Sequence, residues 1–194
     1  MLFRSRTGAK CVWLVGHSEG SLVALTAAQQ PQGICGVVSV SGAGRKLGDV
    51  MREQFRANPA NAPIVDSALK ALDAFEAGRH VPATELAGPL TQVFPDQIQD
   101  YFIDLMAHDP AKLAGSLKVP LLVVQGETDL QTKVDDARAL AAAQPKAKLA
   151  LIPGVNHVLK TAPIDRAANM ATYADPALPV ASAVVETIAG FIKD

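Results

Sequence analysis

Short apolar runs alternate along this chain with longer segments rich in alanine and leucine, and this alternation restricts the possible folds more than any other property. Strands are predicted at residues 12–15, 36–41, 119–125 and 147–152, and helices at residues 21–30, 134–144 and 180–193. Continuous apolar runs are typical of strands that are buried on both faces of a parallel sheet. Each predicted crossover contains a helix, so the strands are expected to run parallel. The pattern predicts an α/β fold with a doubly wound sheet of about four strands.

A segment of different character separates the second predicted strand from the third. It contains no strand-like run, and its prolines fall in breaks or at helix starts. Helices are predicted at residues 49–56, 62–77, 96–107 and 110–117. We therefore expect residues 1–194 to form a single domain, with a helical insertion at about residues 45–117.

Composition excludes several classes of protein. Hydrophobic residues make up 49% of the chain and the net charge is -1, which excludes intrinsic disorder. The 18 basic and 19 acidic residues give no electrostatic basis for binding nucleic acid. Charges, prolines or glycines interrupt every apolar run before it reaches the roughly 20 residues of a membrane span. Residues 1–10 are basic but lack the apolar stretch of a secretory signal.

The two cysteines exclude a scaffold held together by many disulfides. Cys11 and Cys35 lie at the starts of neighbouring predicted strands. Two buried free thiols are the expected state, and a disulfide is the alternative.

The sequence Gly16-His17-Ser18-Glu19-Gly20 lies between the first predicted strand and the first predicted helix. It fits the G-x-S-x-G pattern of a nucleophile elbow, a sharp turn that exposes a serine at the tip of a strand. The two glycines are expected to let helix and strand approach closely. The backbone N–H of Glu19 is a candidate oxyanion donor near the helix N-terminus. The structural alternative is that Ser18 only caps the helix.

A nucleophilic serine needs a base, and the base needs a group that fixes its tautomer. Asp129 follows the third predicted strand, and His157 follows the fourth. The carboxyl ends of parallel strands meet at one edge of a sheet, so Ser18, Asp129 and His157 are expected to converge there. The alternative candidates for the acid are Glu127, Asp135 and Asp136, and those for the base are His17, His80 and His108.

Three segments together resemble the α/β-hydrolase superfamily: GHSEGSLVAL, VPLLVVQGETDLQ and IPGVNHVLK. The chain is most similar to bacterial carboxylesterases related to the serine aminopeptidase and monoacylglycerol lipase group. The resemblance implies cleavage of a small-molecule ester through an acyl-enzyme, with Ser18, Asp129 and His157 as the triad and with no metal or cofactor. It also implies that the helical insertion is a cap that shapes the acyl pocket. A peptidase or amidase of the same fold, or a fragment without activity, are the alternatives.

The chain departs from this family at its front. Four further strands and a second oxyanion donor precede the elbow in the family, so the chain is expected to be the C-terminal part of a longer protein. The strand at residues 12–15 would then be an exposed sheet edge, and the isolated chain is expected to be poorly active or insoluble. The sequence predicts neither an oligomeric state nor a location, whether cytoplasmic or exported.

Overall fold

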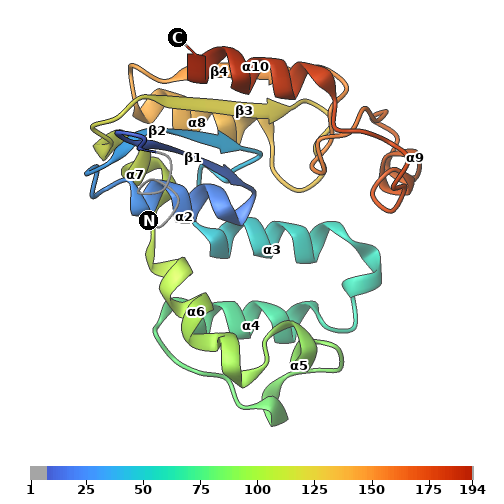
Figure 1. Ribbon diagram of the computed structural model, residues 1–194. Coiled ribbons are helices and arrows are strands. Elements are labelled where there is room, and N and C mark those ends of the chain that lie inside the picture. Colours follow the sequence, from blue (N-terminus) through green and yellow to red (C-terminus); the bar gives the residue numbers. More distant parts are fainter. Residues whose placement is uncertain (1–7, 194) are drawn as a thin grey trace. The chain divides into compact units, whose positions relative to one another are not determined.

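The computed structural model describes residues 8–193, so most of the basic segment at residues 1–10 lies outside the described part. The chain divides into two compact units. One unit contains the residues up to Gly44 together with those from Pro110 onward, and the other is formed by Arg45–Asp109. Figure 1 shows the sheet within the first unit and the helices of the second.

The sheet has four parallel strands in the order β1-β2-β3-β4. They are β1 (Val12–His17), β2 (Ile34–Val40), β3 (Leu121–Gly126) and β4 (Lys148–Ile152). The strands predicted from the sequence are all present, and their parallel direction is confirmed. β1 forms one edge of this sheet, and Val15 on it is 52% exposed.

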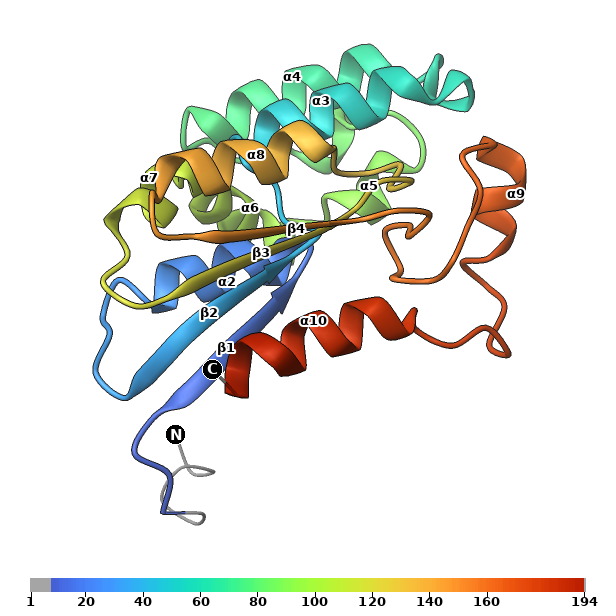
Figure 2. The same ribbon diagram turned by 90° about the horizontal axis from the view of Figure 1, so that it is seen from above.

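Helices cover both faces of the sheet, as a doubly wound arrangement requires. Helices α2 (Glu19–Ala27), α7 (Pro110–Ser116) and α8 (Val134–Ala143) share a core with Val37, Leu121 and Val123 of the strands. Helix α10 (Ser182–Lys193) packs with the alternate strand residues. Figure 2 shows α8 and α10 on opposite sides of the sheet. Two-residue periodicity along the strands directs alternate side chains to the two faces.

The segment between β4 and α10 contains one helix that the sequence pattern did not predict. Helix α9 (Arg166–Ala171) has only six residues, which is too short for a clear apolar period. The Asp165 carboxylate accepts a hydrogen bond from the Ala168 N–H at 2.9 Å and so caps the helix.

The second unit contains four α-helices and no strand among its described residues. They are α3 (Leu47–Ala57), α4 (Val65–Glu76), α5 (Leu90–Val93) and α6 (Asp96–Ala107), with short 3₁₀ turns at Pro59–Asn61 and Ala83–Glu85. Its core contains the buried rings of Phe75 and Phe94, whose centroids are 5.3 Å apart. The predicted insertion extended to residue 117, but this unit ends at Asp109, because α7 packs with α2 and α8 instead.

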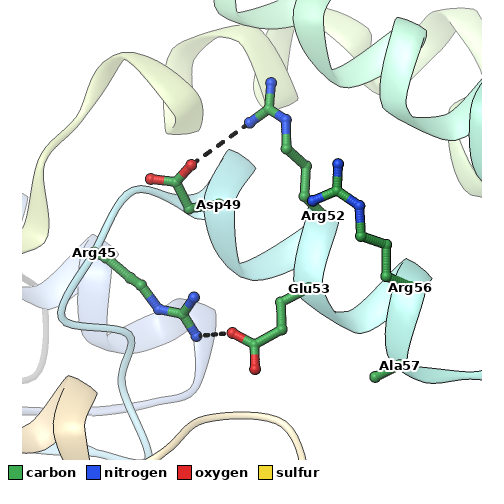
Figure 3. A pocket seen from close by; sticks show the side chains of 6 residues that line it. All are labelled: Arg45, Asp49, Arg52, Glu53, Arg56 and Ala57. Atoms are coloured by element: carbon green, nitrogen blue, oxygen red, sulfur yellow. Dashed lines mark ion pairs between the residues drawn. The ribbon is translucent and has the colours of Figure 1, made fainter.

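Charged side chains hold two helices of this unit together. The Arg52 guanidinium lies 2.6 Å from the Asp73 carboxylate and 2.7 Å from that of Glu76, which links α3 to α4. The hydrogen bond to Glu76 raises the pKa of Arg52 and lowers the pKa of the Glu76 carboxyl. A hollow of about 500 Å³ beside them is lined by Arg45, Asp49, Arg52, Glu53, Arg56 and Ala57 (Figure 3). It contains none of the predicted site residues.

Cys11 and Cys35 form a disulfide, so the expectation of two free thiols is wrong. Their Cα atoms are 5.2 Å apart, within the range that a disulfide spans. The pairing of β1 with β2 shifts between Val12 and Trp13, and this irregularity leaves Cys35 as the extra residue of β2. Apolar periodicity carries no sign of such a one-residue shift in strand register.

The disulfide is expected to contribute about 3 kcal/mol to the free energy of unfolding. The two cysteines are 24 residues apart, and joining them restricts the unfolded chain by loop closure. Replacing both cysteines with serine should lower the free energy of unfolding by this amount in denaturant titrations. Reductant should destabilise the wild type and leave the double variant unchanged. Equal stability of wild type and variant without reductant would contradict the prediction.

Candidate active site

Ser18 occupies the turn between β1 and α2 in a strained backbone conformation. Its φ is 54°, a value that side-chain-bearing residues rarely adopt. The backbone N–H of Ser18 donates to the Val40 carbonyl at 2.9 Å, which fixes the turn to the end of β2. Ser18 lies at the N-cap position of α2, but its side chain makes no capping hydrogen bond. The hydroxyl is instead directed toward His157.

The two glycines of the turn differ in their importance. A Cβ on Gly16 would clash with the Gly20 carbonyl and would lie 2.7 Å from the Ser21 nitrogen. Beyond its chain neighbours and the backbone of its own helix, a Cβ on Gly20 would meet no atom of residues 8–193 within 4 Å. The expectation that both glycines permit the close approach of helix and strand is therefore correct for Gly16 and wrong for Gly20.

The three predicted site residues come together at the carboxyl ends of the strands. Ser18 Oγ lies 3.0 Å from His157 Nε2, and His157 Nδ1 lies 2.8 Å from Asp129 Oδ2. The Asp129 side chain is fully buried, and 6% of the His157 side chain is exposed. The geometry forms a continuous hydroxyl, imidazole and carboxylate chain.

The alternative acids do not take this position. Glu127 is exposed, and Asp135 pairs with Arg138 on the surface of α8. Asp136 is buried, but its carboxylate accepts hydrogen bonds from the backbone N–H groups of Lys133 and Gly44.

The alternative histidines are also placed elsewhere. His80 and His108 lie in the helical unit, where they pair with Asp100 and Asp104 respectively. His17 is close to the site but binds a backbone atom: its Nε2 donates to the His157 carbonyl at 2.7 Å.

Five donors surround the Asp129 carboxylate. Oδ1 accepts from the backbone N–H groups of Gln131 and Thr132, at 2.7 and 3.0 Å. Oδ2 faces His157 Nδ1, the Thr132 hydroxyl at 3.0 Å and the Gln125 amide at 3.2 Å. Burial alone would raise the pKa of Asp129, but the hydrogen bonds from His157 and from the two backbone groups lower it. The carboxylate is therefore held in its charged form.

Sequence reasoning did not single out Gln125 and Thr132. The available signal was Gln125 itself, the only polar side chain in the fully buried strand LLVVQG. A buried amide needs hydrogen-bond partners, so its position at the end of β3 pointed to a polar network there.

A buried polar network also supports the loop that carries His157. The Asn156 side chain donates to the Thr172 hydroxyl at 2.7 Å and to the Asn169 side chain at 3.2 Å. Asn169 in turn donates to the Thr128 carbonyl at 2.8 Å, next to Asp129. The loops bearing His157 and Asp129 are thus linked by contacts other than the one between these two side chains.

Within residues 8–193, no group of three or more His, Cys, Asp or Glu side chains is arranged to hold a metal ion. Over the same residues, no helix combines the length and apolar character needed to cross a bilayer.

A parallel α/β sheet with a strained serine between strand and helix, followed along the chain by an acid and a histidine, defines the α/β-hydrolase class. The sequence profile of the alpha/beta hydrolase family matches residues 3–172. This match covers most of the chain, and the chain belongs to that family.

Known proteins resemble the chain at a distance. It is 25% identical over 165 residues to Esterase EstD of Thermotoga maritima. The alignment covers 81% of this chain and 37% of the esterase. The chain thus spans a little over a third of the length of that curated relative.

Two solved structures show the same fold. A bromoperoxidase from Bacillus anthracis is 20% identical to this chain, with a TM-score of 0.55. The superposition covers 99% of this chain and 71% of the bromoperoxidase chain. The enol-lactonase from Burkholderia xenovorans LB400 is 20% identical to this chain, with a TM-score of 0.51. The superposition covers 99% of this chain and 69% of the lactonase chain.

Proposed function

We propose that this chain carries the reacting side chains of a serine hydrolase that cleaves carboxylic esters through an acyl-enzyme. The observation that carries the proposal is the unbroken series of contacts from Ser18 Oγ through His157 to the buried Asp129 carboxylate. A hydroxyl is a weak nucleophile at its ordinary pKa, and a hydrogen-bonded imidazole is the group that activates it. The similarity to a protein named as an esterase favours an ester as the substrate.

In the proposed first step, Ser18 Oγ attacks the carbonyl carbon of the ester while His157 Nε2 takes the hydroxyl proton. The carbonyl oxygen becomes an oxyanion, and the N–H of Glu19 in the first turn of α2 is the proposed donor to it. His157 then gives the proton to the departing alcohol, which leaves the acyl group on Ser18.

In the second step, His157 removes a proton from water, and the resulting hydroxide attacks the acyl carbon. The acid is released and Ser18 recovers its proton from His157. Asp129 accepts the hydrogen bond from His157 Nδ1 throughout, which fixes the tautomer and stabilises the imidazolium.

A fluorophosphonate probe tests this proposal, because it reacts with an activated serine and not with an ordinary one. The folded chain is expected to acquire a single adduct on Ser18, located by fragmenting the tryptic peptide of residues 11–45 in mass spectrometry. Chain unfolded in denaturant provides the control and should remain unlabelled, because the contacts to His157 are then lost. An adduct on another serine, or equal labelling of folded and unfolded chain, would contradict the proposal.

A further inference from the structure

The buried Gln125 amide faces the side of the Asp129 carboxylate that binds His157. We propose that Gln125 is a positioning residue, which holds Asp129 Oδ2 in place for His157 through a hydrogen bond that no other orientation of its amide can make. The inference rests on the proposed hydrolase function and extends it to the residue that orients the acid.

The surroundings of Gln125 fix the orientation of its amide. Gln125 is fully buried at the end of β3. Its Nε2 lies 3.1 Å from the Gly126 carbonyl, 3.3 Å from the Thr132 carbonyl and 3.2 Å from Asp129 Oδ2. All three partners are acceptors, so a flipped amide would direct its oxygen against three other oxygens. The NH₂ group therefore faces the carboxylate permanently.

A count of protons shows why the carboxylate receives one of them. The amide has two protons for its three acceptors. An ionised carboxylate is a stronger acceptor than a backbone carbonyl, so one amide proton is assigned to Asp129 Oδ2. The Thr132 hydroxyl has one proton and three oxygens nearby: Asp129 Oδ2 at 3.0 Å, the Ser41 carbonyl at 3.2 Å and Gln125 Oε1 at 3.5 Å. The same preference directs that proton to Asp129.

The result is a carboxylate whose rotation is restricted from both ends. Two backbone N–H groups hold Oδ1, while Gln125 and Thr132 hold Oδ2 beside His157 Nδ1. A rotated carboxylate would lose several hydrogen bonds. Water could not replace them, because the Asp129 side chain is fully buried. Gln125 thus acts on Ser18 through Asp129 and His157, without touching the substrate.

The substitution Gln125→Met keeps the length of the side chain and removes both amide protons. We expect kcat for p-nitrophenyl acetate to fall about 10- to 100-fold with KM nearly unchanged, because a hydrogen bond to a charged group is lost. Gln144→Met is the matched control. Gln144 also donates to two backbone carbonyls, at 3.2 and 3.4 Å, but no carboxylate lies among its partners. The control should retain kcat within a few-fold.

The substitution Gln125→Glu gives a more specific test. It would place a carboxyl oxygen where the amide nitrogen lies, 3.2 Å from Asp129 Oδ2. Two carboxylates at this distance share one proton rather than both ionising. The variant should therefore lose more activity at neutral pH than Gln125→Met, and its pH profile should gain a titration that the wild type lacks.

A measurement independent of turnover separates this inference from the proposed function. The proton between His157 Nδ1 and Asp129 should give a far-downfield ¹H NMR resonance in the wild type, absent in Asp129→Ala. We expect the resonance to shift or broaden in Gln125→Met and in Thr132→Val, and to be unchanged in Gln144→Met. If the wild type neither reacts with the fluorophosphonate nor hydrolyses esters, the proposed function fails while this arm still decides the role of Gln125.

The positioning role is overturned if Gln125→Met leaves both the resonance and kcat as in the wild type. It is also overturned if Gln125→Met lowers kcat as much in an Asp129→Ala background as in the wild type, because Gln125 would then act independently of the acid. Gln125→Glu provides the second variant should Gln125→Met fail to fold.

Discussion

Replacing Ser18 with alanine is expected to reduce the hydrolysis of short p-nitrophenyl esters roughly 10⁴-fold or more, and to abolish fluorophosphonate labelling. The hydroxyl is the only nucleophile in contact with His157 Nε2 among the described residues, so its removal leaves the imidazole without a group to activate. Initial rates on the purified full chain measure the effect. The fold should persist, since the Ser18 side chain caps no helix.

Ser21→Ala is the matched control for this substitution. Ser21 lies three residues further along in α2, and its buried hydroxyl contacts that of Ser39 at 2.6 Å rather than the histidine. Its loss should leave turnover within a few-fold of the wild type, at a cost in stability of about 1 kcal/mol. Full activity in Ser18→Ala would show that another residue is the nucleophile.

Replacing Gly16 with alanine is expected to lower ester turnover by about 100-fold or more and to destabilise the chain by about 3 kcal/mol. The new Cβ would clash with backbone atoms of Gly20 and Ser21, which cannot move aside like the end of a flexible side chain. The first turn of α2 must then shift away from β1, and Ser18 shifts with it. Turnover and the midpoint of thermal unfolding measure the two effects.

Gly20→Ala, at the other end of the same motif, is expected to leave the stability of the chain and the shape of the turn intact. Its Cβ would enter open space, and alanine is favoured over glycine within a helix by about 1 kcal/mol. Stability should therefore stay equal or rise slightly, and the backbone of the elbow should be retained. Equal effects of Gly16→Ala and Gly20→Ala would contradict the geometry of this turn.

Much of the fold followed from the sequence because its periodic patterns are local. The four apolar runs gave the strands, and the helix within each crossover gave their parallel direction. Parallel direction alone brings the ends of β1, β3 and β4 to one edge of the sheet. This is why three residues up to 139 positions apart can be expected from the sequence to meet.

The supporting residues could not be obtained in the same way. The contacts of Gln125 and Thr132 with Asp129, and of Asn156 with Thr172, depend on the exact path of irregular loops, which carry no periodic signal. The same is true of α9, whose six residues are too few to show a pattern.

Local sequence patterns were enough to predict the class of fold and the order of the four strands, and they favoured Ser18, Asp129 and His157 as the side chains that meet at the sheet edge. The disulfide between Cys11 and Cys35, the steric need for Gly16 but not Gly20, and the donors to Asp129 became visible only in the folded chain. The two kinds of feature differ in how far apart along the chain the interacting residues lie. Apolar periodicity depends only on residues that are close together in the sequence. A shifted strand register or a single hydrogen bond depends on the precise placement of segments that are distant in the chain.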